Sequence, residues 1–183
     1  GAVLHCLALS RVLTSKGHDV SVIDYRPATA TPQAFWQGWG LRSDPSLTKA
    51  RVRWIELLHG ASVRRGFSRF KASTMRFTEA CTTVADVERV AAGFDAVVVG
   101  SDQVWNECFF ERPVYFLGFP FRGKRIAYAA CCGHAPTAAA QGSLESVRSW
   151  LRAFDSISVR NEVTCQFVTR CIGNTCDVVA DPT

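Results

Sequence analysis

The sequence predicts an α/β fold built on a parallel sheet. Segments typical of strands alternate with segments typical of helices, which indicates βαβ units. The clearest strand, 94–99, is a continuous apolar run, as in parallel sheets that are covered on both faces. The composition, 48% apolar and 20% charged over 183 residues, is that of a globular chain with a core and excludes disorder.

The first two elements are predicted to be a helix and a strand. Residues 2–16 form an amphipathic pattern, and Gly17 stands where a helix would stop. The apolar positions of that helix are Ala2, Cys6, Leu9 and Leu13. Residues 18–25 alternate and contain β-branched side chains, which predicts a strand. Because a helix, a turn and a strand make the second half of a βαβ unit, we expect the unit's first strand to precede Gly1.

The segment 26–77 interrupts the alternation, and we interpret it as a basic, partly helical insertion. Residues 46–77 contain eight Lys or Arg and one Glu, a net charge of +7 in a chain whose total is +5, so the basicity is local. The basic stretch 49–76 could contact an acidic sugar chain or an anionic membrane surface, or its charges could simply face water. No RNA-binding signature accompanies it, and we expect no nucleic-acid partner.

The remainder predicts helices and strands in turn. Thr83 and Asp86 have the spacing of a capping box and begin a short helix that ends at Gly93. Strands are expected at 94–99, 124–130, 156–159 and 177–180. Two further helices present Leu144, Val147, Leu151 and Phe154, and then Val163, Phe167 and Cys171 before Gly173 as a stop. This order predicts a Rossmann-like parallel sheet with helices on both faces.

Ligands of open parallel sheets bind beyond the carboxyl ends of the strands, so the residues that follow each strand are candidates for a site. After 94–99 come Gly100, Ser101, Asp102, Gln103, Trp105 and Asn106. Glycine permits close approach, Ser and Gln can bond hydroxyls or phosphate, Asp can act as a base, and Trp offers a face to a sugar. The alternative is a turn whose Trp covers the core.

A second candidate follows the strand 156–159. Asn161 can cap the next helix, whose N-terminus attracts anions, and Arg160 adds a bidentate donor for phosphate or carboxylate. The alternative is a surface ion pair between Arg160 and Glu162. After 124–130, His134 is either a proton carrier or a loop residue.

The eight cysteines form no C-x-x-C pair, so we expect no metal site and interpret them as thiols of a reduced core. The nearest approach to a metal motif is the segment 131–134, Cys-Cys-Gly-His. No stretch is long and apolar enough to cross a bilayer and no signal peptide pattern begins the chain, so we expect a cytoplasmic protein. Dinucleotide, P-loop and nucleophile-elbow motifs are absent from the sequence.

Several ordered blocks together resemble the polysaccharide pyruvyl transferases. They are 94–106, 115–117, 124–130, 154–160 and 178–183. The opening residues 1–4 are also similar to the family's start, and the resemblance is weakest between 26 and 77. Two departures stand out: Asn161 occupies a position that is commonly acidic in the family, and the segment 130–133 reads Ala-Cys-Cys-Gly in place of an Ala-Ser-Phe-Gly type sequence.

The resemblance implies a two-lobed fold of the GT-B type, of which 1–183 would be the N-terminal lobe, with the C-terminal lobe absent from the chain. It implies transfer of pyruvate from phosphoenolpyruvate to a sugar of a cell-surface or exopolysaccharide precursor as a ketal, with no further cofactor. The acceptor would be a sugar or a lipid-linked oligosaccharide. By the family match, Arg160 would bind the phosphoenolpyruvate anion. Asp102, Gln103 and Asn106 would make either acceptor contacts or structural contacts at the cleft. We expect the general acid in the second lobe, and hence no activity from this chain alone.

Two other functions stay open. Because the lobes are alike, the chain could belong to a GT-B glycosyltransferase that uses a nucleotide sugar. It could also be a non-catalytic lobe that binds acidic glycans through the stretch 49–76. The sequence favours no particular oligomeric state.

Overall fold

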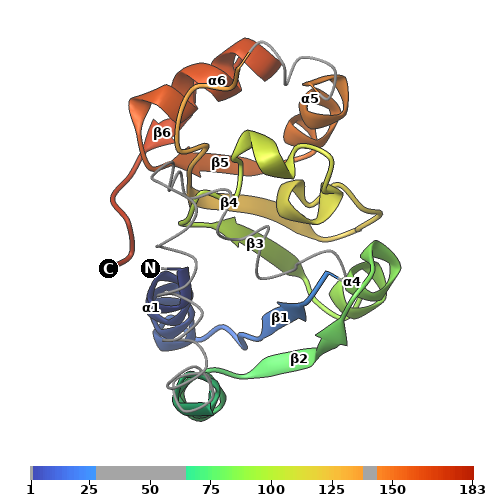
Figure 1. Ribbon diagram of the computed structural model, residues 1–183, viewed down its shortest axis with the longest axis vertical. Helices are drawn as coiled ribbons and strands as arrows, with labels where there is room; N and C mark the ends of the chain where they lie inside the picture. Colours follow the sequence, from blue (N-terminus) through green and yellow to red (C-terminus); the bar gives the residue numbers. More distant parts are fainter. Residues whose placement is uncertain (1, 28–64, 138–143) are drawn as a thin grey trace, which may run out of the picture.

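The computed structural model describes residues 2–27, 65–137 and 144–183, which form helices and parallel strands (Figure 1). Most of the predicted insertion lies outside these residues. Its described residues include a helix at 65–74, and Phe77 at its end is the first residue of a strand. The extent of the insertion stays a prediction.

Strands and helices alternate as predicted. The elements are α1 (Ala2–Ser15), β1 (Val22–Tyr25), β2 (Phe77–Cys81), α4 (Val84–Ala91), β3 (Ala96–Gly100), η1 (Glu107–Phe109), η2 (Pro113–Phe116), β4 (Lys124–Ala130), α5 (Leu144–Arg152), β5 (Ser156–Val159), α6 (Glu162–Ile172) and β6 (Asp177–Val178). Every strand pair is parallel, which confirms the α/β class. Within the described residues the strands make two sheets and not the single predicted one: β1 pairs with β2, and the other sheet has the order β3-β4-β5-β6.

The break between the two sheets lies between β1 and β3, which are neighbours in Figure 1. Among the described residues, no backbone hydrogen bond joins these two strands. In a right-handed βαβ unit, a strand that led into α1 would lie beside β1, which is where the break occurs. The strand that the sequence predicts before Gly1 stays a prediction.

The register of the larger sheet brings its carboxyl ends to one edge. Gly100 at the end of β3 pairs with Tyr128, and Val159 at the end of β5 pairs with Ala130 and Val178. The bounds of β4 and β5 are those predicted. Residues that follow these strands therefore meet at a common edge, as the position of a ligand site requires.

The smaller sheet differs most from the prediction. β1 begins at Val22 and not at 18, because its partner strand begins at Phe77. That partner, β2, was not predicted. Within β2 only the side chain of Cys81 is buried, so its sequence lacks the alternating apolar pattern that indicates a strand.

One face of the larger sheet carries the main core. Trp105, Phe116, Leu151 and Phe167 are buried in one cluster with residues of β4 and β5, so η2, α5 and α6 cover this face. On the other face of β3, Val98 is 39% exposed. Among the described residues, helices therefore do not cover both faces of the sheet at β3, contrary to the prediction.

The predicted helix faces hold except at particular positions. Val147 and Leu151 are buried in α5, and Phe167 and Cys171 are buried in α6. Val163 was predicted to share the face of α6 but is 39% exposed, and Thr164 and Val168 are buried in its stead. In α1 the buried side chain is Leu7, whereas Ala2 of the predicted face is exposed.

The predicted helix ends are confirmed by their hydrogen bonds. Thr83 and Asp86 form a capping box at the start of α4. Asn161 caps α6 by accepting a hydrogen bond from the backbone N–H of Thr164 at 3.0 Å, and Gly173 ends that helix with a φ of 80°. The N-terminus of α6 is therefore fixed directly after Arg160.

Candidate functional site

The candidate site is the set of segments that follow β3, β4, β5 and β6. Backbone hydrogen bonds hold these segments together beyond the strands. The N–H of Ser101 donates to the carbonyl of Tyr128 at 3.0 Å, that of Cys131 to Asp102 at 3.1 Å, and that of Arg160 to Ala130 at 3.0 Å. The loops after neighbouring strands are thus bound to one another, which fixes the side chains that they carry.

Arg160 forms an ion pair with Asp181, which follows β6. The guanidinium Nη1 lies 3.1 Å from Asp181 Oδ2, and the two side chains are 27% and 21% exposed. Burial by itself would lower the pKa of Arg160, but hydrogen bonds to Cys131 and Asp181 outweigh it and the pKa is raised. The predicted alternative, a pair with Glu162, is not formed: Glu162 is exposed in the first turn of α6.

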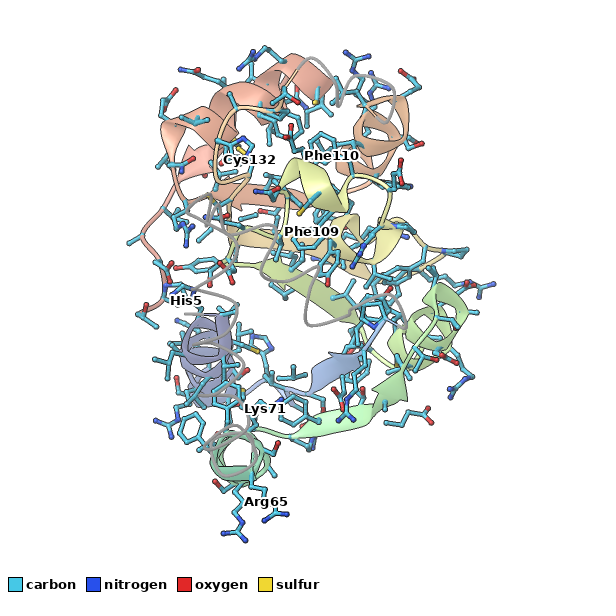
Figure 2. The ribbon with its side chains drawn as sticks, in the orientation of Figure 1. His5, Arg65, Lys71, Phe109, Phe110 and Cys132 are labelled. Carbon is cyan, nitrogen blue, oxygen red and sulfur yellow. The ribbon has the colours of Figure 1, made fainter. Side chains whose placement is uncertain are left out.

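His5 of α1 joins this pair, although no sequence pattern singles it out. His5 is labelled in Figure 2. Its Nε2 lies 3.3 Å from Asp181 Oδ1, and its Nδ1 lies 2.6 Å from the carbonyl oxygen of Ser101. His5 and Ser101 are 96 positions apart, so no local pattern connects them. His5, Arg160 and Asp181, which we call the edge triad, come from α1, the end of β5 and the segment after β6.

The backbone turn after β3 is strained and close to its neighbour. Gly100 has a φ of 137°, and a Cβ at this position would lie 2.1 Å from the carbonyl oxygen of Tyr128, so only glycine fits. Ser101 follows with a φ of 44°, and its buried hydroxyl has no hydrogen-bond partner among the described residues. An unpaired buried hydroxyl costs about 1–3 kcal/mol, and a ligand oxygen is one group that would remove this cost.

Asp102, Gln103 and Asn106 hold the loop itself. The Asp102 carboxylate accepts a hydrogen bond from the N–H of Gln103 at 2.8 Å, and Asn106 caps η1 by accepting one from Cys108. A Cβ on Gly133 would lie 2.9 Å from Gln103 Oε1. The loops after β3 and β4 therefore interlock through these residues, and their roles toward substrate stay predictions.

Trp105 is a core residue, which corrects the prediction that its face is offered to a sugar. The side chain is fully buried, and its ring stacks on Phe116 with 5.9 Å between ring centroids. The indole N–H donates to the carbonyl of Tyr115 at 3.1 Å. The ring therefore has no face free for a ligand. The structure has the alternative arrangement, a turn whose Trp covers the core.

His134 lies in the loop after β4 and is exposed. Its Nδ1 is 3.1 Å from the carbonyl oxygen of the next residue, Ala135, which is a local loop contact. The structure thus brings His5, and not His134, into contact with Asp181.

Cys131 occupies the centre of the edge. Its buried Sγ accepts hydrogen bonds from the N–H of Gly133 at 3.2 Å and from the side-chain amide of Asn161 at 3.4 Å. The thiol thus accepts hydrogen bonds as a serine hydroxyl at this position would. All eight cysteines carry free thiols, and no group of three or more His, Cys, Asp or Glu in the described ranges could hold a metal ion.

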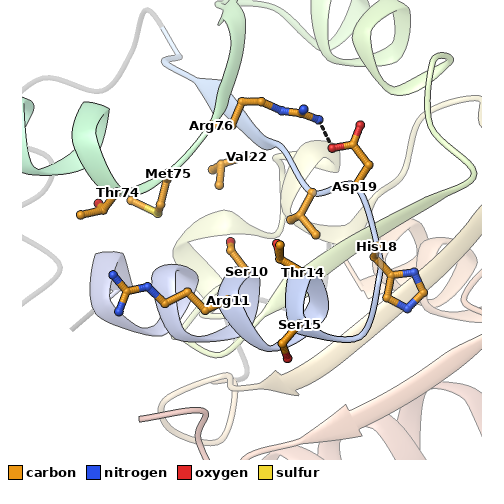
Figure 3. Close-up of a pocket in the computed structure, with 11 residues that line it drawn as sticks. Ser10, Arg11, Thr14, Ser15, His18, Asp19, Val22, Thr74, Met75 and Arg76 are labelled. Atoms are coloured by element: carbon orange, nitrogen blue, oxygen red, sulfur yellow. Dashed lines mark ion pairs between the residues drawn. The ribbon is translucent and has the colours of Figure 1, made fainter.

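A groove lies elsewhere on the molecule. It has a volume of about 530 Å³ and is bounded by α1, the start of β1 and the end of the helix 65–74 (Figure 3). Its charged side chains include Arg76, which pairs with Asp19 at 2.5 Å. Because Val22 and Arg76 mark the amino ends of β1 and β2, this groove is at the edge opposite to the triad. We place the candidate site at the triad, where charged groups and strand ends converge.

Fold and site together define an α/β protein in which Arg160, Asp181 and His5 meet at the carboxyl ends of the strands. A family model for polysaccharide pyruvyl transferase matches residues 1–183, the whole chain. The chain belongs to that family and is an enzyme, a transferase. No curated protein and no solved structure matches the chain. In the described ranges, no helix is long and apolar enough to cross a membrane.

Proposed function

We propose that this enzyme transfers pyruvate from phosphoenolpyruvate, without a further cofactor, to a sugar of a cell-surface or exopolysaccharide precursor in the cytoplasm, forming a ketal. The chain would act as the first lobe of a GT-B-like enzyme. Family membership supports pyruvyl transfer. The observation that carries the choice of an anionic donor is the position of Arg160 at the N-terminus of α6, beside His5 and Asp181.

The reaction makes two demands on the protein, the binding of an anionic donor and the movement of protons. An acid protonates the methylene carbon of phosphoenolpyruvate, which leaves a cationic carbon that one sugar hydroxyl attacks with loss of its proton. A second hydroxyl then loses its proton and forms a C–O bond at the same carbon, while the C–O bond to phosphate breaks and phosphate leaves. The protein must therefore bind a phosphate and a carboxylate and move protons. The edge triad answers the first demand, and the acid is proposed to lie in a second lobe.

Replacing Arg160 tests the donor site. Arg160→Ala is expected to abolish phosphoenolpyruvate-dependent phosphate release in the enzyme that comprises both proposed lobes, while the fold is retained. Arg160→Lys keeps the charge but loses the bidentate fork and should recover part of the activity. Arg170→Ala, an exposed arginine of α6, is the matched control. Phosphate release by Arg160→Ala close to that of the unchanged enzyme would refute the assignment.

The rival functions predict different ligands. A ligand that binds the folded state raises the unfolding temperature, so the chain is titrated with phosphoenolpyruvate and, separately, with a nucleotide diphosphate sugar. Stabilisation by the nucleotide sugar alone would favour a glycosyltransferase. Binding of an acidic glycan that disappears when Arg65, Arg69 and Lys71 are neutralised would favour the glycan-binding lobe.

A further inference from the structure

Asp181 lies between two cationic side chains that belong to different elements. One carboxylate oxygen is 3.3 Å from His5 Nε2, and the other is 3.1 Å from Arg160 Nη1. The side chains of His5 and Arg160 are 15% and 27% exposed, so a small solute can reach them. The carboxylate of Asp181 thus occupies the place where the proposed substrate anion would bind.

The hydrogen bonds of His5 indicate which protonation state this arrangement suits. A carbonyl oxygen only accepts, so Nδ1, 2.6 Å from the carbonyl of Ser101, must carry a proton. In a neutral ring, Nε2 would then direct its lone pair at the carboxylate of Asp181. Only a doubly protonated ring donates to both oxygens. The contacts of His5 therefore fit the imidazolium ion.

The charge of the triad depends on that proton. With His5 protonated, two positive side chains face one carboxylate, and the triad carries a net charge of +1. With His5 neutral, Arg160 and Asp181 cancel each other. The other titratable groups nearby are the thiol of Cys131, which is bonded to Arg160, and the hydroxyl of Tyr128, 3.5 Å from the carbonyl of Ala180.

We propose that anion binding at the edge triad is linked to protonation of His5. The protonated ring neutralises Asp181, which leaves Arg160 available to an incoming phosphate or carboxylate group. Loss of the proton leaves Asp181 to engage Arg160 and to repel the anion. Binding of the anion and of the proton thus favour each other reciprocally. The inference rests on the proposed function for the identity of the natural anion, the donor, and extends it to the control of donor binding.

Sulfate is the probe for this linkage, because its charge is constant between pH 5.5 and 8 whereas phosphate and phosphoenolpyruvate titrate there. Sulfate binding to the chain is measured by calorimetry across this range, in which histidines titrate. We expect the affinity at pH 5.5 to exceed that at pH 8 by at least about fivefold, the lower end of typical coupling between sites. Binding should take up a proton, which is seen as a dependence of the heat on the buffer.

Three variants locate the effect. His5→Gln should bind sulfate with little dependence on pH, and His18→Gln, which replaces an exposed histidine of the α1–β1 connection, should behave as the unchanged chain. Asp181→Asn removes the internal carboxylate and should bind sulfate more tightly than the unchanged chain at pH 8. Circular dichroism checks that each variant is folded.

The inference is overturned if His5→Gln keeps the full dependence on pH, if Asp181→Asn binds no more tightly at pH 8, or if sulfate does not bind. A failure of the proposed function looks different. In that case sulfate binding stays linked to protonation of His5, while the enzyme releases no phosphate from phosphoenolpyruvate in the presence of sugar acceptors.

Discussion

Replacement of Trp105 distinguishes a role in the core from a role in substrate binding. A core residue would lower the stability of the fold when replaced, whereas a substrate-binding residue would lower the affinity for the acceptor. The side chain is fully buried between Phe116 and Phe154, and its N–H bonds the carbonyl of Tyr115. Truncation of a buried Trp to Ala costs about 3–5 kcal/mol. Trp105→Phe keeps a ring but loses volume and leaves the Tyr115 carbonyl unpaired, a loss of about 2 kcal/mol.

These losses translate into large shifts of the unfolding temperature. For a chain of this size 1 kcal/mol corresponds to about 2–4 °C, so the loss of about 3–5 kcal/mol in Trp105→Ala should lower the unfolding temperature by about 6–20 °C, and that of about 2 kcal/mol in Trp105→Phe should lower it by about 4–8 °C. Urea and thermal unfolding followed by far-ultraviolet circular dichroism measure both. Trp150→Phe, a partly buried residue at the margin of the same cluster, is the control and should lose less.

The reasoning is refuted by a specific pair of results. If the free energy of unfolding of Trp105→Ala is within about 1 kcal/mol of that of the unchanged chain, and the enzyme's affinity for its sugar acceptor falls, then the ring is not essential to the core. The expected pattern is the reverse: lower stability, with acceptor affinity retained by Trp105→Phe at temperatures well below its unfolding.

Two further predictions concern the backbone and pH. Gly100→Ala should lower the free energy of unfolding by about 3 kcal/mol or more, because a Cβ would lie 2.1 Å from the Tyr128 carbonyl oxygen. Gly173→Ala should cost only about 1 kcal/mol, because nothing lies within 4 Å of its added carbon. Equal losses in urea unfolding would contradict this prediction. Hydrogen bonds from the N–H groups of Thr82 and Thr83 lower the pKa of Asp86 from 3.8 to about 2. The folded state thus favours the carboxylate, so its contribution to stability is present above about pH 4 and disappears as the pH falls toward 2. Asp86→Asn should be less stable than the unchanged chain at pH 6 and differ little from it near pH 2, and a constant difference would be evidence against the capping box.

Local patterns predicted those elements whose burial follows from their own sequence. β4 and β5 have the predicted bounds because each is a short run between turn residues, and α4 and α6 begin at the predicted caps. β2 was missed because it is largely exposed and pairs only with β1, which is 52 or more residues earlier in the chain. A strand of this kind is defined by its partner and not by its own pattern.

The candidate site shows the same division. Gly100, Ser101 and Arg160 could be selected because they directly follow strands. Asp181 also follows a strand but was noted only as part of a family block, and its pairing with Arg160 depends on how β5 and β6 are aligned. His5 lies on a helix in which the apolar spacing selects other residues as the buried ones. Its role depends on contacts with residues 96 or more positions away, which one sequence does not reveal.

The break between β1 and β3 has a mechanical consequence. With no backbone hydrogen bond across it among the described residues, α1, β1 and β2 are joined to the rest of the fold there by side chains. His5 is one of these links, since it extends from α1 to Ser101 and Asp181 on the far side. The His5 ring therefore also connects the two sheets. Loss of its charge would weaken its contact with Asp181, and with it the connection at the edge where the substrate is expected to enter.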